Sequence, residues 1–210
     1  MPPSATDTRR KLIDAATRAF ADDGIGSASL IEITRQAGQK NRGALHYHFG
    51  SREGVLCAVL EVHAGFLSTR EGELLALARE RPDDDVSSVV EAIVRPAVEL
   101  AESGWRGRCF LQVLAQLVEE DQEALDPDVQ AAMSHTGGYE VYAVLAERMG
   151  PMADDVRTER FSLVTSFILR AVADRARASE RKARGRQQLD LDGFVANLVA
   201  MVAAMLTAPT

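Results

Sequence analysis

The spacing of apolar residues is the feature that most restricts the fold. Through most of the chain they recur every three or four positions, and no segment alternates with the period of two that strands require. Glycines and prolines fall between these stretches, where one helix ends and the next begins. Hydrophobic residues make up 46% of the 210 positions, which is enough to form a core. The sequence therefore predicts an all-α fold of nine to ten helices.

Three helices are expected at the N-terminus, over residues 7–23, 30–37 and about 40–46. Ser29 is expected to cap the second helix, with Glu32 reaching back to the Ser29 amide in a capping box. Gly38 permits a tight turn between the second helix and the third. Two short helices joined by such a turn form a helix-turn-helix, whose second helix fits a DNA major groove about 12 Å wide.

Longer helices are expected behind residue 50. The expected ranges are 51–79, 109–118, 127–149, 155–179 and 191–206, and a further helix follows the acidic triplet 83–85 and contains Pro96. Asp126 and Pro127 form a start signal, because proline at the first helical position follows an N-cap residue. Gly137 and Gly138 fall inside the 127–149 helix, where each costs about 1 kcal/mol relative to alanine. We expect a first domain of residues 1–50 and a second of residues 51–210.

Charge is distributed unevenly along the chain. The net charge is −7, yet residues 1–50 hold seven basic and five acidic side chains, which gives them +2 and leaves −9 on residues 51–210. A mildly basic N-terminal region followed by an acidic remainder is typical of a protein that binds DNA phosphates through its N-terminal region alone. No apolar run approaches the ~20 residues that cross a bilayer, and the N-terminus lacks the order of a signal peptide. We expect a cytoplasmic protein with no membrane partner.

Cysteine and histidine usage points away from metals. Cys57 and Cys109 lie far apart in apolar helical contexts, whereas a disulfide framework or a Cys-based zinc site needs more cysteines or closer spacing. We interpret both as small buried hydrophobic residues, with a redox-sensing thiol as the alternative. His46 and His48, two positions apart on a helix, do not converge on one ion. We therefore expect no cofactor and no metal.

The segment from residue 29 to residue 56 carries the most specific signal. Within this segment, the third expected helix of the chain should present Lys40, Asn41, Arg42, His46 and Tyr47 outward. Side chains of these types reach base edges and phosphates. Residues from about 8 to 60 resemble the DNA-binding domain of the TetR/AcrR family of transcriptional regulators. The resemblance rests on Phe20 with Gly24, Ser29 with Ile33 and Ala37, Gly38, the run Leu45-His46-Tyr47-His48-Phe49, and Ser51-Arg52 with Leu56 one position late.

The resemblance implies a set of DNA-binding residues: Ser29, Lys40, Asn41, Arg42, Gly43, His46, Tyr47 and Arg52. It implies that Ser29 and Arg52 bind phosphate, with Arg52 in place of the family's lysine. His46 stands where the family usually has a phosphate-binding tyrosine, so protonation of its imidazole would add charge. Ile31 replaces a usual polar residue, which puts base contact from the second helix in doubt. From the residues alone, a plain helical hairpin with a solvated basic face is the alternative.

The region behind residue 50 has more apolar and aromatic side chains than one thin layer of helices needs. Our candidates for a mostly apolar effector pocket are Phe66, Trp105, Phe110, Leu114, Met133, His135, Tyr139, Tyr142 and Phe167. Gly137 and Gly138 would leave room for a ligand or allow two helices to approach closely. Plain core packing is the alternative for any one of these residues.

The last two expected helices carry apolar stripes. One is formed by Phe161, Val164, Ile168 and Val172, and the other by Phe194, Leu198, Met201 and Met205. In the resembled family these helices pair with a second subunit in a four-helix bundle, which implies a homodimer. Burial against the chain's own body is the alternative. A dimer would place two recognition helices about one helical turn, ~34–36 Å, apart on a pseudo-palindrome.

Together these features predict a ligand-responsive transcription regulator, with repression as the family's usual mode. It would bind a palindromic double-stranded operator as a homodimer and be released by a largely apolar small molecule. No enzyme is expected, because the sequence has no glycine-rich phosphate loop, no serine elbow motif and no convergent His/Asp/Glu set. The other rival is a helical adaptor whose first domain binds protein instead of DNA.

Overall fold

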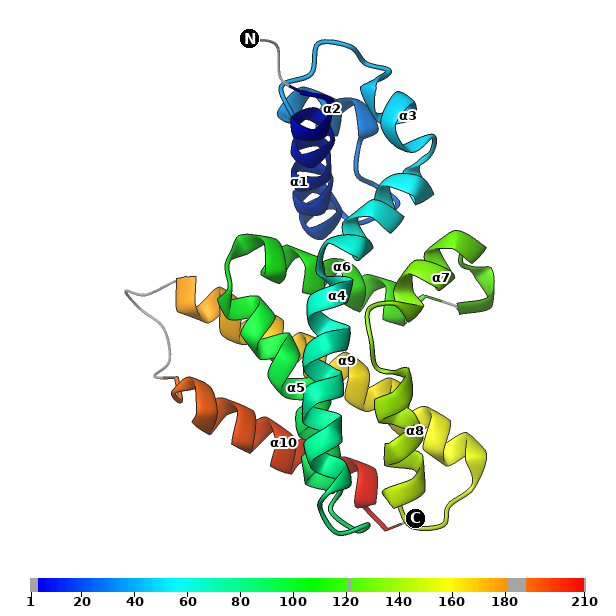
Figure 1. The fold of residues 1–210 in the computed structure, drawn as a ribbon, viewed down its shortest axis with the longest axis vertical. Coiled ribbons are helices and arrows are strands. Elements are labelled where there is room, and N and C mark those ends of the chain that lie inside the picture. Colours follow the sequence, from blue (N-terminus) through cyan, green and yellow to red (C-terminus); the bar gives the residue numbers. More distant parts are fainter. Residues whose placement is uncertain (1–3, 121, 181–187, 210) are drawn as a thin grey trace. The chain divides into compact units, whose positions relative to one another are not determined.

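A computed structural model describes residues 4–120, 122–180 and 188–209. Within these ranges the regular structure is ten α-helices and one 3₁₀ turn, with no strand, which confirms the all-α expectation (Figure 1). The helices are α1 (Ala5–Asp23), α2 (Leu30–Gln36), α3 (Ala44–Phe49), α4 (Arg52–Arg79), α5 (Val86–Glu102), α6 (Trp105–Glu119), α7 (Pro127–Ser134), α8 (Tyr139–Arg148), α9 (Asp154–Glu180) and α10 (Leu191–Thr207). Among the described residues, no helix combines the length and the apolar character needed to cross a lipid bilayer.

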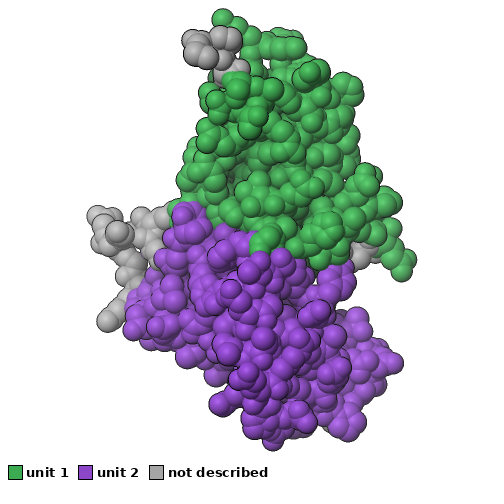
Figure 2. Space-filling model, in the orientation of Figure 1, with its two compact units in different colours: residues 1–65, 105–136 green, residues 66–104, 137–210 purple. Residues whose placement is uncertain are grey.

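Internal contacts divide the chain into two compact units (Figure 2). The first unit comprises residues 1–65 and 105–136, and so contains α1 to α3, the start of α4, α6 and α7. The second comprises residues 66–104 and 137–210, with the rest of α4, α5 and α8 to α10. The expected first domain lies within the first unit, and its boundary after residue 50 stays a prediction.

In the first unit, α1 packs against both α2 and α6. Leu12 and Phe20, on its apolar stripe, are fully buried. Polar contacts tie α6 to α1 as well: Arg106 donates from Nε and Nη2 to the two carboxylate oxygens of Asp14, both at 2.6 Å. Gln116 Nε2 donates to the Phe20 carbonyl at 2.9 Å. The N-terminal helices therefore rest on a packed support provided by α6.

In the second unit, α5 is the central helix and packs against α8, α9 and α10. Val90, Val94 and Val98, one turn apart along α5, have no exposed surface. Pro96 lies inside α5, as the sequence predicted, and is buried. The core of this unit is therefore built around one apolar helix.

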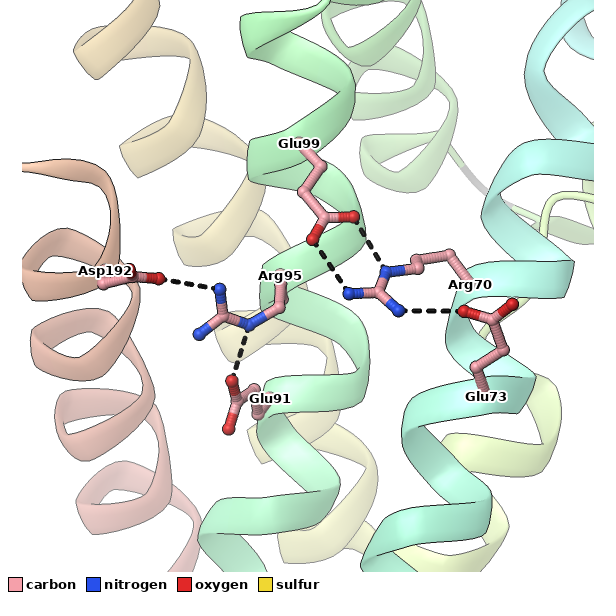
Figure 3. Close-up of polar contacts among 6 residues, drawn as sticks. All are labelled: Arg70, Glu73, Glu91, Arg95, Glu99 and Asp192. Atoms are coloured by element: carbon pink, nitrogen blue, oxygen red, sulfur yellow. Dashed lines mark hydrogen bonds and ion pairs between the residues drawn. The ribbon is translucent and has the colours of Figure 1, made fainter.

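Two arginines bridge the helices of the second unit (Figure 3). Arg70 of α4 donates from Nε and Nη2 to Glu99 of α5, at 2.9 and 3.1 Å. Arg95 of α5 donates from Nη1 to Asp192 of α10, at 2.9 Å. Each guanidinium also pairs with a carboxylate one turn away on its own helix. Both side chains of the Arg70–Glu99 pair are partly buried, so this pair holds α4 to α5 more firmly than a freely exposed pair would, whereas Asp192 is 82% exposed.

The expectation of one continuous helix over residues 127–149 is wrong. Two helices, α7 and α8, occupy it, and Gly137 and Gly138 between them have φ angles of 96° and 90°. Glu71 of α4 lies against the break: its Oε2 accepts a hydrogen bond from the Gly138 amide at 2.6 Å, and a Cβ on Gly137 would overlap the same carboxylate. The two glycines therefore form a left-handed turn instead of weakening a helix. Smaller differences are that α3 begins at Ala44 and α6 at Trp105.

Candidate nucleic-acid interface

Ser29 is the N-cap of α2, as the sequence predicted. Its Oγ accepts a hydrogen bond from the Glu32 amide at 3.3 Å, and its hydroxyl proton remains available for a second partner. The reciprocal half of the capping box is wrong: the Glu32 carboxylate accepts from Arg35 Nε and Nη2, at 2.8 and 2.6 Å, and from Gln36 at 3.0 Å. The Arg35 hydrogen bonds lower the pKa of Glu32 to about 2. The Glu32 carboxylate thus pairs with the charged Arg35, one turn along the helix, and not with the Ser29 amide.

The turn between α2 and α3 holds four of the predicted DNA-binding residues. Lys40, Asn41, Arg42 and Gly43 are all exposed, but they precede α3 instead of lying on it. Asn41 explains the difference, because its Oδ1 accepts from the Gly43 amide at 2.9 Å in a side-chain turn that competes with helix. The Asn41 carbonyl then accepts from the Ala44 amide at 3.1 Å, where the helix starts.

Helix α3 has one packed face and one exposed face. Ala44 and Leu45 are buried, whereas His46 is exposed and Tyr47 is 84% exposed. The Nδ1 atom of His46 lies 2.5 Å from the carbonyl oxygen of Gly50. Because a carbonyl only accepts hydrogen bonds, Nδ1 carries the proton and Nε2 is the ring atom left for an outside partner. A neutral His46 therefore accepts at Nε2, and it donates there only when it is protonated.

Arg52 has a structural role that the sequence did not indicate. Its Nη1 atom donates to the carbonyls of Ile25 and Ala28, at 2.6 and 2.8 Å, and its side chain is half-buried. This contact fixes the loop that leads to Ser29. One guanidinium nitrogen of Arg52 is thus occupied within the chain, and the phosphate contact expected of Arg52 stays a prediction.

Two family comparisons decide the classification. Residues 12–59 match the bacterial regulatory proteins of the tetR family, and residues 91–205, more than half of the chain, match the tetracyclin repressor-like C-terminal domain. The chain belongs to the TetR family. The helix-turn-helix formed by α2 and α3 therefore lies within the N-terminal region that matches this family.

Named relatives agree with the TetR assignment. HTH-type transcriptional regulator SrpR of Pseudomonas putida is 45% identical over 56 residues, which are 27% of this chain and 26% of that protein. HTH-type transcriptional regulator AcrR of Shigella flexneri is 28% identical over 110 residues, which are 52% of this chain and 49% of that protein. The matched region thus spans between a quarter and a half of these two relatives.

Solved structures show the same fold at low sequence identity. AibR, crystallised with isovaleryl coenzyme A and operator DNA, has a TM-score of 0.54 at 15% identity, over 97% of this chain and 100% of that one. A tetR family transcription regulator from Shewanella sp. PV-4 has a TM-score of 0.55 at 15% identity, over 96% of this chain and 99% of that one. These likenesses concern the fold alone.

The effector-pocket candidates of this TetR-family chain do not gather in one unit. The first unit holds Trp105, Phe110, Leu114, Met133 and His135, and the second holds Phe66, Tyr139, Tyr142 and Phe167. Several have other surroundings than expected: Trp105 lies under the Arg18 guanidinium, 3.8 Å from its ring centre, and borders a polar groove of about 520 Å³. Phe110 is fully buried against His63, and Tyr139 is 70% exposed.

Among the effector-pocket candidates, Tyr142 has both a polar and an aromatic partner. Its hydroxyl hydrogen-bonds to Thr165, and its ring packs against Phe161 at 5.0 Å between centroids. Burial raises the pKa of the Tyr142 phenol. Sequence reasoning missed the neighbouring Glu71, which is 8% exposed and whose pKa burial raises to about 7. A single glutamate in a long helix gives no sequence signal of burial.

Only some of the residues predicted to form the dimer interface are exposed on the surface of the chain. Val164, Ile168, Val172 and Leu198 are at most 2% exposed, so the chain's own body covers them and the expectation that they form a free face is wrong. Met201 and Met205 are 46% and 37% exposed, and Phe161 and Phe194 are half-buried. Sequence reasoning missed Leu163, which is 53% exposed. Phe167, Phe194 and Met201 border a groove of about 590 Å³ lined mainly by α9 and α10.

Within the described residues, no group of three or more His, Cys, Asp or Glu side chains could hold a metal ion. Cys57 and Cys109 are both half-buried and are not joined in a disulfide. Burial raises the pKa of the Cys57 thiol, with the carboxylates of Asp128, Asp126 and Glu61 adding to the effect. A raised pKa keeps this thiol protonated and makes it a poor nucleophile.

Proposed function

We propose that this protein is a ligand-responsive transcription regulator, acting as a repressor that binds a palindromic operator as a homodimer and leaves it when a small molecule binds. Membership of the TetR family and the exposed turn-and-helix surface of residues 40–47 support this proposal. SrpR and AcrR, to which the chain is similar, are HTH-type transcriptional regulators, which fits the same activity. As a gene regulator it would work in the cytoplasm and would not be an enzyme.

The observation that carries the proposal is the exposure of Arg42, His46 and Tyr47 around a helix whose other face is buried. Arg42 would donate to base edges, because arginine pairs bidentately with guanine in the major groove. Ser29, with its free hydroxyl proton, and protonated His46 would bind phosphates. Lys40, Asn41, Gly43 and Tyr47 complete the contact surface, and Arg52 would add phosphate contact only through nitrogens not occupied by the loop carbonyls.

A homodimer would join two such surfaces. The exposed apolar side chains of the last two helices, Leu163, Met201 and Met205, supply a face that gains from being covered. Binding of a palindromic operator would require the two α3 helices of such a dimer to lie about one turn of DNA apart, ~34–36 Å. The dimer face would therefore use the outer side of α9 and α10, while their inner stripes stay in the core of each subunit.

An effector would act by favouring a dimer whose α3 helices are wrongly spaced. Its binding and operator binding would oppose each other by the same coupling free energy, because the two equilibria share one protein. AibR was solved with isovaleryl coenzyme A and operator DNA, so one protein of this fold has a small molecule and DNA as its ligands. For this chain, a largely apolar compound that reaches Tyr142 and Phe161 is the proposed effector class.

Selection of duplexes from a random pool tests the proposal. The protein should enrich a pseudo-palindrome, and its affinity for the enriched duplex should fall steeply as salt rises. Arg42→Ala should weaken binding to this duplex far more than binding to random DNA, because a lost base contact costs about 1–3 kcal/mol of discrimination. Arg79→Ala, which removes an exposed arginine of the second unit, should change neither.

Two results would contradict the proposal. The first is that no duplex is enriched or retained at low ionic strength. The second is that a partner protein, and no duplex, is bound in a salt-independent manner, which would favour the adaptor function. Melting-temperature screening against small molecules, followed by competition with the enriched duplex, then tests the effector.

A further inference from the structure

An isoleucine stands exposed on α2, two positions after Ser29, which is proposed to bind a DNA phosphate. Among the large hydrophobic side chains of residues 4–60, the exposed ones are Ile31 and Tyr47, at 60% and 84%. Ile31 lies in the first turn of α2, two positions after the N-cap Ser29. Ile33 and Thr34, further along the helix, are buried. At 100° per residue, Ile31 points about 110° away from the middle of this buried pair.

The polar side chains of α2 are occupied with one another. The Glu32 carboxylate accepts two hydrogen bonds from Arg35 and one from Gln36, and the acidic and basic charges cancel. Arg35 and Gln36, the donors that could otherwise read a base from this helix, therefore each direct hydrogen bonds to Glu32. Ile31 is left as the side chain of the first turn that offers a contact to an outside partner, and that contact is apolar.

The major groove presents one apolar group for such a contact. Thymine carries a 5-methyl group there, whereas the other base edges present hydrogen-bond donors and acceptors. Covering a donor or acceptor with an isoleucine removes its water without supplying a partner, which costs free energy. Covering a methyl group releases water from two apolar surfaces and is favourable. An exposed isoleucine on the outer side of α2 therefore discriminates in favour of thymine.

We propose that Ile31 reads the 5-methyl group of a thymine in the operator, so that the protein prefers a T·A pair where the start of α2 meets the groove. This inference rests on the proposed function, because it assumes that α2 and α3 dock on duplex DNA. It adds a specificity determinant that acts by apolar contact, beside the hydrogen-bond donors of residues 40–47.

Replacement of thymine by deoxyuridine tests the inference, because it removes the methyl group and leaves the hydrogen bonds of the base pair unchanged. Affinity for the selected operator would be measured by fluorescence anisotropy with each thymine replaced in turn. At the position read by Ile31, loss of the methyl should weaken binding by about fourfold, from ~0.8 kcal/mol for one buried carbon. Ile31→Ala should weaken binding to the thymine duplex by a similar factor and should bind both duplexes equally.

Two controls sharpen the comparison. Val62→Ala truncates another exposed β-branched side chain of the first unit, on α4, and should keep the parent's full response to the methyl group. An operator with cytosine at the critical position should bind weakly, and 5-methylcytosine there should recover part of the affinity, because the methyl group occupies the same place in the groove. Ile31 and Val62 are both exposed, so neither substitution should affect folding.

The outcomes separate this inference from the proposed function. Operator binding that is unchanged by deoxyuridine at every position overturns the role of Ile31 and leaves the proposed function standing. An Ile31→Ala variant that keeps the parent's methyl preference overturns it as well. Absence of any duplex binding at low ionic strength overturns both.

Discussion

Replacing Glu71 by glutamine should stabilise the protein at pH 8.5 much more than at pH 5. Glu71 is 8% exposed, and its neighbours include the Gly138 amide, which donates to it at 2.6 Å. Burial raises the pKa of this carboxyl from its ordinary value of 4.5 to about 7, and the Gly138 hydrogen bond offsets only part of that effect. Glutamine keeps an acceptor oxygen for Gly138 and carries no charge to desolvate.

The direction of the pH dependence follows from the two pKa values of Glu71. The folded protein holds the proton more tightly than the unfolded chain, so folding is favoured at low pH, and stability is lost as the pH rises from 4.5 to 7. Each tenfold change in proton affinity is worth about 1.4 kcal/mol, so the full loss is on the order of 3 kcal/mol. Glu71→Gln lacks this loss, and its advantage over the parent should grow by about 2–3 kcal/mol between pH 5 and pH 8.5.

Urea denaturation followed by circular dichroism at the two pH values measures this difference. Protein concentration must be equal throughout, because a dimer's stability depends on it. Glu61→Gln is the matched control, since it replaces an exposed carboxylate of the same helix and reports the effect of the chemical change alone. An advantage of Glu71→Gln that is equal at pH 5 and pH 8.5, or larger at pH 5, would refute the reasoning.

Three further predictions concern the same molecule. Gly137→Ala should lower the free energy of unfolding, measured by urea denaturation, by about 2–4 kcal/mol, because alanine resists the left-handed φ and would displace Glu71. Gly72→Ala is the control: it has open space around its Cβ inside α4 and should raise the free energy of unfolding by about 0.5–1 kcal/mol. Equal effects of the two substitutions would contradict this prediction. His46→Ala should weaken binding to operator and random duplexes alike in anisotropy titrations, because it removes the exposed imidazole proposed to contact a phosphate; unchanged affinity for both would contradict that contact. Arg52→Ala should lower the melting temperature and weaken binding to operator and random duplexes alike, since it frees two loop carbonyls; a loss confined to the operator would show base reading instead.

Helix boundaries set by local interactions were predictable from the sequence. Ser29, Asp85 and Asp126 each cap a helix, as their positions before apolar stretches indicated. Pro127 occupies the start of α7, and Gly24 follows α1 with a positive φ. These signals depend on residues within one turn, so a linear reading of the chain contains them.

Features that depend on distant residues were not predictable. The break between α7 and α8 is hydrogen-bonded to Glu71, which lies 67 positions before Gly138. Periodicity likewise shows that a helix has an apolar face but does not show what covers it, which is why buried Val164 and Ile168 were expected on a dimer face. The late start of α3 was a local feature that sequence reasoning missed, because Asn41 was interpreted as a base contact and not as a turn residue.

The central claim is that the surface around α3 meets duplex DNA, and photo-crosslinking from position 47 tests it most directly. The Tyr47 side chain is 84% exposed, so p-benzoylphenylalanine in its place should not disturb the fold. Irradiation with the selected duplex should link the protein to DNA through this position, whereas the same group in place of Val62 should give no link. A duplex that binds with full affinity but crosslinks from position 62 and not from position 47 would contradict the account.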